Sequence, residues 1–309
     1  MQKAPGKSHR DGISLFELVK MFPNEEAARK WLEECRWGEE RLCPHCGSEA
    51  NIHIPKEKPM PYHCTDCRKF FSVRTNTVMA QSKIPLQKWV FAIYLWATSL
   101  KGVSSMKLHR DLKITQKSAW FMAHRLREAF EQNGGIFSGP VEADETYVGG
   151  LEKNKHDHKK LKAGRGGVGK TAIVGAKDRK TNKVAAKVVD KTDAKTLQGL
   201  VNAHSDKDAT IYTDENRAYI GLSNHKTVSH SAGEYVRGDV HTNGIESFWA
   251  MLKRAHKGTF HKMSPKHLQR YVNEFSGRHN MRDLDTVAQM ETIVAAMIGK
   301  RLTYTQLKG

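Results

Sequence analysis

The chain contains 309 residues, of which 39% are hydrophobic and 27% are charged. This composition is typical of a globular protein large enough for two domains, and it excludes a disordered chain. Lys and Arg outnumber Asp and Glu by 51 to 33, which gives a formal net charge of +18 and favours a nucleic-acid or anionic-membrane partner. Because no apolar run reaches transmembrane length and the N-terminus lacks the apolar core of a secretion signal, we expect no membrane contact and a cytoplasmic, nucleoid-associated protein.

The N-terminal part of the chain is expected to be mainly helical around a small cysteine-rich segment. Hydrophobic periodicity predicts two short helices within residues 13–36, one helix over 85–101 and two more within 103–131. Asn24 is expected to cap the second of these helices. A Gly-Gly dipeptide at 134–135 indicates the end of this part of the chain.

Four of the five cysteines form two Cys-x-x-Cys pairs, Cys43 with Cys46 and Cys64 with Cys67, separated by 17 residues. This spacing is typical of a zinc ribbon, in which two tight turns bring four thiolates to one ion. Four protein thiolates leave no open coordination position, so we expect the Zn²⁺ to be structural. A redox motif would need one pair at the start of a helix near a βαβ unit, and the sequence predicts none there. Cys35 is expected to be a small buried residue of the preceding helix.

A helix-turn-helix is predicted over residues 103–130, with Thr115 as the cap of its second helix. The apolar residues of that helix leave Lys117, Arg125 and Arg127 for an outer basic face, which suits a recognition helix that contacts DNA. The alternative interpretation is an ordinary amphipathic helix pair with solvated charges.

From residue 139 onward, the pattern changes to a mixture of strands and helices. The predicted strands cover 141–148, 171–177, 183–189, 209–213 and residues near 226–230, and the predicted helices cover about 194–204, 243–255, 264–278 and 284–300. This order of elements predicts a mixed α/β fold.

Three acidic residues in this part of the chain suggest a shared site. Asp144 lies in a predicted strand, Asp214 ends another, and Glu246 lies in a predicted helix. Each has an ordinary explanation, because Asp144 could be a solvated strand end and Asp214 could cap the next turn. Glu246 could complete a capping box with Asn243. Together, however, acids gathered in a basic protein suggest divalent metal ions held against a polyanion, as in enzymes that cut or join nucleic acid.

The sequence around these acids resembles the catalytic blocks of DDE transposases. The blocks are Asp-Glu-Thr-Tyr-Val-Gly-Gly (144–150), Tyr-Thr-Asp (212–214), His-Thr-Asn-Gly-Ile-Glu-Ser-Phe-Trp-Ala-Met-Leu-Lys-Arg (241–254), and, further on, residues 261–275 with Arg278-His279-Asn280. The closest resemblance is to the bacterial insertion-sequence family with an N-terminal zinc ribbon, and it covers roughly residues 40–282.

This resemblance implies an α/β fold with a ribonuclease H-like mixed sheet flanked by helices, preceded by a small zinc ribbon and a helical helix-turn-helix region. The chain is then expected to divide into an N-terminal helical segment (1–40), the zinc ribbon (41–80), a helical DNA-binding region (81–135), the ribonuclease H-like catalytic domain (136–300) and a C-terminal tail (301–309).

The resemblance also implies roles for individual residues. Carried over by motif, these are Asp144, Asp214 and Glu246 as magnesium ligands and Lys253 and Arg254 as DNA contacts. Some members of the family place an asparagine in the third role, so Asn243 is an alternative to Glu246. Glu142 and Glu145 are alternatives to Asp144, and strand alternation puts Glu142 on the same face as Asp144 and Glu145 on the other.

The implied activity is Mg²⁺-dependent DNA transposition. Such an enzyme binds the terminal repeats of its element in double-stranded DNA, cleaves at their ends and joins them to target DNA by two-metal in-line transesterification. Because two ends must be joined, a homodimer or a higher synaptic assembly is expected. The alternatives are a ribonuclease H-like nuclease or resolvase without strand transfer, and a zinc-ribbon DNA-binding regulator.

Three further motifs have simpler interpretations. Residues 164–171 match the Walker A pattern, but they precede a predicted strand instead of a helix, which favours a basic loop near DNA over nucleotide binding. His156 and His158 could bind a metal, although a solvated loop is the simpler interpretation. His241 could assist proton transfer, although an ordinary polar role explains it equally.

Overall fold

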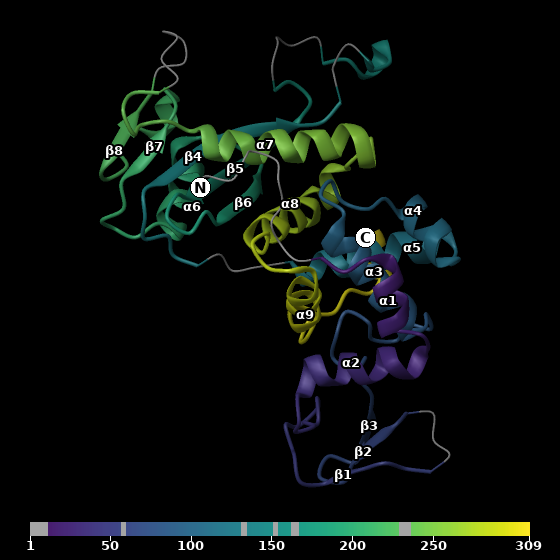
Figure 1. The fold of residues 1–309 in the computed structure, drawn as a ribbon. Coiled ribbons are helices and arrows are strands. Elements are labelled where there is room, and N and C mark those ends of the chain that lie inside the picture. The colour runs from purple at the N-terminus through teal and green to yellow at the C-terminus, as the bar shows by residue number, and fades with distance from the viewer. Residues whose placement is uncertain (1–11, 57–59, 131–134, 151–153, 162–166, 229–235) are drawn as a thin grey trace. The chain divides into compact units, whose positions relative to one another are not determined.

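The computed structural model describes residues 12–56, 60–130, 135–150, 154–161, 167–228 and 236–309. The chain forms two compact units (Figure 1). Unit 1 comprises Met1–Phe130 and Met281–Gly309, and unit 2 comprises Glu131–Asn280. Each unit has hydrophobic clusters of its own.

Unit 1 is built mainly from helices around one apolar core. Its helices are α1 (Leu15–Met21), α2 (Glu25–Trp37), α3 (Leu86–Thr98), α4 (Ser105–Leu112), α5 (Gln116–Ala129), α9 (Thr286–Ala296) and α10 (Tyr304–Lys308). The two expected caps are present, since Asn24 and Thr115 each accept a hydrogen bond from a backbone N–H in the first turn of α2 and α5. The apolar helix α3 buries Trp89 and Trp96 completely in this core.

Helix α9 belongs to unit 1, although it follows unit 2 in the sequence. Its residues Met290 and Ile293 are buried in the same hydrophobic cluster as the residues of α3. The catalytic domain predicted for residues 136–300 includes α9, whereas unit 2 ends at Asn280. The helix predicted over 284–300 is present as α9, but an apolar stripe does not reveal which of two cores will bury it.

A small three-stranded sheet in unit 1 carries the cysteines. Its strands β1 (Ile52–His53), β2 (Tyr62–Cys64) and β3 (Lys69–Phe71) pair antiparallel in the order β1-β2-β3. Tyr62 and Phe71 form a separate buried cluster with two of the cysteines, and Trp37 of α2 packs against it.

Unit 2 is built on a five-stranded sheet. Its strands are β4 (Val141–Val148), β5 (Thr171–Asp178), β6 (Val184–Val189), β7 (Ile211–Thr213) and β8 (His225–Thr227), in the order β6-β5-β4-β7-β8. The pairs β4–β5 and β5–β6 are antiparallel, whereas β4–β7 and β7–β8 are parallel. Strand β4 therefore lies at the centre, between an antiparallel half and a parallel half.

Helices cover both faces of this sheet (Figure 1). Helix α6 (Ala194–His204) packs on one face through Leu197, Leu200 and Val201. Helices α7 (Asn243–Ala255) and α8 (Pro265–Asn280) pack on the other, where Trp249 and Phe275 are buried. The predicted fold class, a ribonuclease H-like mixed sheet flanked by helices, is thereby confirmed.

Among the described residues of unit 2 there are also short helical turns: 3₁₀ turns at Asp157–Lys159 and Arg217–Tyr219, and a π-helical turn at His256–Phe260 that continues α7. Across the described residues, none of the helices is both long and apolar enough to span a lipid bilayer.

Candidate active site and zinc site

The four paired cysteines converge in unit 1. Their Sγ atoms all lie within 4.8 Å of one another, and the Cys43–Cys67 and Cys46–Cys64 Sγ pairs are each separated by 3.7 Å. Four sulfur atoms about 2.3 Å from a central zinc ion lie roughly 3.8 Å apart at the corners of a tetrahedron. The sulfur positions therefore fit one tetrahedral Zn²⁺, as the sequence predicts.

The local backbone explains how the first pair of cysteines reaches this geometry. After Cys43 the chain turns tightly, with Gly47 N donating to Cys43 O at 2.8 Å and Cys43 N donating to Ser48 O at 2.9 Å. Gly47 has φ of +79°, a left-handed conformation in which a glycine is favoured because it has no Cβ. The turn therefore folds the Cys-x-x-Cys segment into a knuckle around the site.

In unit 2, Asp144 and Asp214 meet beside the end of β7. Strand β7 pairs with β4 at Val141 and Glu142, so the chain of β7 ends just as β4 reaches Asp144. The carboxylate oxygens of Asp144, Glu145 and Asp214 lie within 4.8 Å of one another. Two of the three predicted acids are therefore brought together, and Glu145 joins them.

Glu145 joins the cluster even though strand alternation puts its side chain on the face opposite to Asp144. Its carboxylate accepts hydrogen bonds from Asn216 Nδ2 at 2.7 Å and from Tyr219 Oη at 3.1 Å. Asn216 also donates its backbone N–H to Asp214 Oδ1 at 3.1 Å, so one residue holds both acids. The sequence does not predict this link directly, although an asparagine two residues after an aspartate is typical of a turn that bonds back to the aspartate.

Glu246 lies in the first turn of α7 and outside that tight group of oxygens. It is close enough to Asp144 for its negative charge to raise the pKa of Asp144. Its Oε1 accepts a hydrogen bond from Thr242 Oγ1 at 2.7 Å. The capping box considered for Asn243 and Glu246 is not formed, because α7 starts one residue earlier than that motif requires and its N-cap is Thr242.

The crowding of these carboxylates has an electrostatic cost. Burial, followed by the charges of Glu145, Asp214 and Glu246, raises the pKa of Asp144 to about 8. Burial also raises the pKa of Glu145, although the hydrogen bond from Asn216 partly opposes this. Like charges held together in a desolvated place favour a proton or a cation between them. The donor set consists of carboxylate oxygens, the ligands preferred by hard divalent cations, so the cluster fits such an ion.

Comparison with known proteins shows which family the chain resembles, over the segments that carry the two clusters. The ISXO2-like transposase domain family matches residues 136–280, and the transposase zinc-ribbon domain family matches residues 23–70, together more than half of the chain. The chain belongs to the insertion-sequence DDE transposases with a zinc ribbon. It is also 28% identical over 280 residues to a protein described as an uncharacterized protein in transposable element ISH50 of Halobacterium salinarum, a match that covers 85% of this chain and 93% of that protein.

The residues of this transposase that are predicted to contact DNA differ in exposure. Lys253 and Arg254, in the last turn of α7, are both exposed, as is Lys117 at the start of α5. Arg125 and Arg127 are buried, with 8% and 2% of their surfaces exposed.

The predicted basic outer face on α5 is therefore wrong for these two arginines. The guanidinium of Arg127 lies over the ring of Trp96, and that of Arg125 lies over the ring of Phe121. Long arginine side chains can lie along apolar surface and stack on aromatic rings, so their positive charge alone does not place them in solvent.

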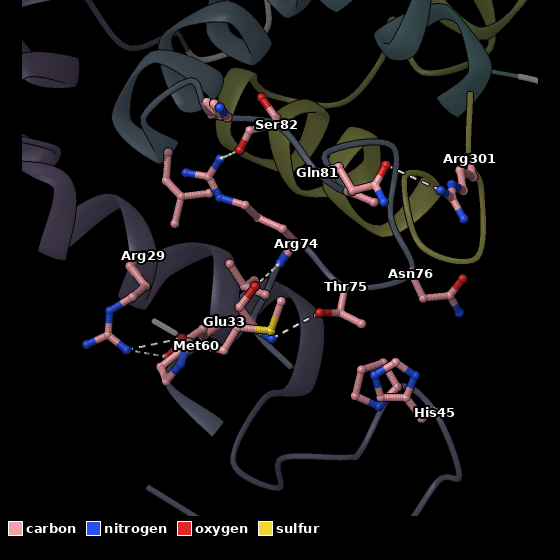
Figure 2. Close-up of a pocket in the computed structure, with 17 residues that line it drawn as sticks. Arg29, Glu33, His45, Met60, Arg74, Thr75, Asn76, Gln81, Ser82 and Arg301 are labelled. Atoms are coloured by element: carbon pink, nitrogen blue, oxygen red, sulfur yellow. Dashed lines mark hydrogen bonds and ion pairs between the residues drawn. The ribbon is translucent and has the colours of Figure 1, made fainter. Parts of the chain in front are cut away.

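A basic groove lies in unit 1 of the transposase, beside the zinc ribbon (Figure 2). Its volume is about 860 Å³, and Glu33 is the only acid among the described residues that line it. Arg74 stabilises the local structure, because it donates hydrogen bonds to the carbonyl oxygens of Ser82 and Ile84. Of the other cations in the lining, Lys83 and Arg301 are exposed, as is the imidazole of His45.

The remaining motifs have structural explanations. The Walker-like segment 164–171 lies partly outside the described residues, and its last residue, Thr171, begins β5 instead of a helix. His156 and His158 stack on each other with ring centroids 5.7 Å apart. His241 interacts with Arg179, whose Nη2 lies 2.8 Å from His241 Nδ1.

Replacing Cys43 or Cys64 with Ser should release the zinc ion, because a hydroxyl is a much poorer ligand than a thiolate. Bound zinc, measured by inductively coupled plasma mass spectrometry on the purified chain, should fall from about one ion per chain to near zero. Cys35→Ser is the matched control and should retain its zinc. Full zinc content in Cys43→Ser would contradict the site.

The stability of the metal-free protein should fall as pH rises from about 4 to about 8. Asp144 has its pKa raised from 3.8 to about 8 in the folded state, so the folded state binds more protons than the unfolded state in this window. Thermal unfolding without added Mg²⁺ or Mn²⁺ measures the effect, because the acids are then metal-free while the zinc site keeps its ion. Asp144→Asn should flatten this pH dependence, and an unchanged slope in that variant would contradict the raised pKa.

Proposed function

We propose that this protein binds the terminal repeats of its element in double-stranded DNA, cleaves at their ends and joins them to target DNA. The single observation that supports this most is the convergence of Asp144 and Asp214 at the end of β7 in a domain of the DDE transposase family. The proposal names Mg²⁺ as the catalytic ion, because Mg²⁺ takes oxygen ligands and keeps several of its waters.

Asp144, Asp214 and Glu246 would hold the catalytic ions. When bound, two Mg²⁺ ions stabilise the attacking and the leaving oxygen of an in-line displacement at phosphorus. A water oxygen first attacks the phosphorus at the element end, and the bond from phosphorus to the 3′ oxygen breaks, which leaves a 3′-hydroxyl. That hydroxyl then attacks a phosphorus of the target, and a second 3′ oxygen leaves. Because a water oxygen or a 3′-hydroxyl attacks phosphorus directly in each step, no covalent bond between protein and DNA is required.

Glu246 is proposed as the third ligand in preference to Asn243. Asn243 is the first residue of α7 and is exposed. Glu246 is half-buried, and its charge acts on Asp144. A role for Glu145 as a ligand is less favoured, because both of its oxygens already accept hydrogen bonds from Asn216 and Tyr219.

The DNA backbone is proposed to lie along the exposed end of α7. Lys253 is seven residues after Glu246, which places it two turns or about 10 Å further along the helix. A phosphate held by Lys253 or Arg254 would therefore lie within a few nucleotides of the cations held by the acids. The exposed cations of the basic groove in unit 1 offer a second surface to a polyanion. The synaptic assembly of two element ends is expected to need at least two copies of the chain.

Two alternative functions share most of these features. A ribonuclease H-like nuclease or resolvase would cleave the same DNA without joining it, and a regulator would bind it without cleavage. Incubation of the protein with Mg²⁺, terminal-repeat DNA and a target plasmid distinguishes them. Joined products support the transposase, cleaved ends alone support the nuclease, and a shifted but intact DNA supports the regulator.

Asp144→Asn and Asp214→Asn should each abolish cleavage and strand transfer, with a loss of at least about a thousandfold, because each variant removes a charged ligand of the catalytic ions. Binding of terminal-repeat DNA should be unchanged within about threefold in a gel-shift assay. The matched control Asp208→Asn changes an exposed aspartate of unit 2 and should cleave normally. Turnover by Asp144→Asn near the wild-type rate would refute the proposed role.

The double variant Lys253→Ala, Arg254→Ala should lower the salt dependence of DNA binding. Each phosphate contact contributes about 0.9 to the slope of log K against log salt, so the slope should fall by about two. Fluorescence anisotropy at several salt concentrations measures it. Lys207→Ala, an exposed lysine elsewhere in unit 2, is the control and should change the slope little. An unchanged slope in the double variant would exclude contact of this helix end with DNA.

A further inference from the structure

Glu142 is a buried acid two residues before Asp144, and its charge is used within the protein. Only 2% of its surface is exposed. Its Oε1 accepts a hydrogen bond from Arg179 Nε at 2.7 Å, and its Oε2 accepts one from the backbone N–H of Ile245 at 2.8 Å. It does not belong to the oxygen cluster around Asp144. Glu142 therefore binds the start of α7 and an arginine, although it lies on the same face of β4 as Asp144.

The start of α7 is capped in an unusual way. The first N–H groups of a helix have no partners within it, and the side chain of the N-cap residue usually accepts from one of them. The N-cap of α7 is Thr242, yet its side chain accepts no such hydrogen bond. Its hydroxyl instead donates to Glu246 Oε1 at 2.7 Å, and Glu142 accepts from Ile245 N. Glu142 of β4 thus caps α7, and the hydroxyl of Thr242 binds the carboxylate of Glu246 instead.

Glu142 is itself fixed from several directions. Arg179 follows β5 and donates from Nη2 to His241 O at 2.7 Å, which ties the segment before α7 to the same arginine. The guanidinium of Arg179 lies over the ring of Tyr212 in β7. Through an arginine that follows β5, the network therefore connects β4, β7 and the start of α7, which position the three acids.

Gly244 makes the close approach of α7 to β4 possible. A Cβ atom at this position would lie 2.6 Å from Glu142 Oε2 and 2.8 Å from Lys177 Nζ, both closer than real Cβ contacts. An alanine would therefore push the first turn of the helix away from the carboxylate that caps it. The contact is sensitive to a single methyl group.

We propose that Glu142 is a positioning residue that sets the place of Glu246 relative to Asp144 and Asp214. It acts by capping α7 at Ile245, which leaves Thr242 free to orient the carboxylate of Glu246. This inference rests on the proposed role of Glu246 as the third ligand of the catalytic ions. A merely structural ion pair would stabilise the fold without acting through Glu246.

A double-mutant cycle on the full-length protein separates these two roles. The Kd for Mn²⁺, measured by electron paramagnetic resonance of the free ion, is determined for wild type, Glu142→Gln, Glu246→Gln and the double variant. Loss of a residue that orients a ligand weakens metal binding by about tenfold or more, so Glu142→Gln should raise the Kd by that factor. In the Glu246→Gln background the same change should alter the Kd by less than about twofold, because its effect passes through Glu246.

Glu274→Gln is the matched control, since Glu274 is fully buried and paired with Arg278 in α8 of the same unit. It should leave the Kd for Mn²⁺ unchanged. If Glu142→Gln does not fold, Gly244→Ala takes its place in the cycle with the same expected outcomes. Equal effects in both backgrounds, or an unchanged Kd in a folded Glu142→Gln protein, would overturn the positioning role. An unchanged Kd in Glu246→Gln alone would instead contradict the proposed third ligand.

Discussion

The mutual repulsion of carboxylates at the end of β7 is the constraint around which unit 2 is organised. Asp144, Glu145 and Asp214 hold their oxygens within 4.8 Å of one another, and burial and repulsion raise the pKa of Asp144 to about 8. Buried acids this close together stay in place only where other contacts of the fold hold each of them. The parallel pairing of β4 with β7 brings Asp214 to Asp144, and Asn216 ties Asp214 to Glu145.

The two faces of the sheet in unit 2 differ in the residues that they carry. The face covered by α6 is mainly an apolar layer, although strand alternation places Glu145 on it as well. On the face covered by α7, buried apolar residues lie next to the candidate site. Trp249 of α7 lies against Gly175, and Gly175 is the partner of Asp144 across the β4–β5 pair. A Cβ at Gly175 would lie 2.7 Å from the ring of Trp249. The close seating of α7 therefore depends on glycines at two points, and it carries Glu246 towards the acids of the sheet.

The two clusters of candidate metal ligands differ in their donor atoms. In unit 1, four sulfur donors can satisfy a zinc ion completely, which is what a small sheet with a limited core needs for its stability. In unit 2, three acids offer fewer oxygen ligands than the six or more that a hard cation takes, which would leave room for water and phosphate oxygens. The cysteine cluster is therefore suited to a structural ion, and the acidic cluster is suited to an ion that also contacts a substrate.

Much of this architecture could be predicted from the sequence, because it depends on local patterns. The strand at 141–148 and the helices at 194–204 and 243–255 have the bounds expected from periodicity, and the Cys-x-x-Cys spacing indicated the zinc ribbon. Burial of charged side chains could not be predicted in this way. Arg127 is stacked on Trp96 inside unit 1, and Glu142 and Glu145 have partners 37 to 103 residues away in the chain. Such contacts depend on tertiary packing, which residue type alone does not specify.

The most direct test of this account is the anomalous diffraction of crystals of the protein grown with Mn²⁺ in place of Mg²⁺. The account predicts an anomalous peak between the carboxylates of Asp144 and Asp214, with an oxygen of Glu246 within coordination distance of a bound ion and Glu142 still bonded to Ile245 N. A peak elsewhere in unit 2, or an ion at this place that Asp214 does not coordinate, would contradict it.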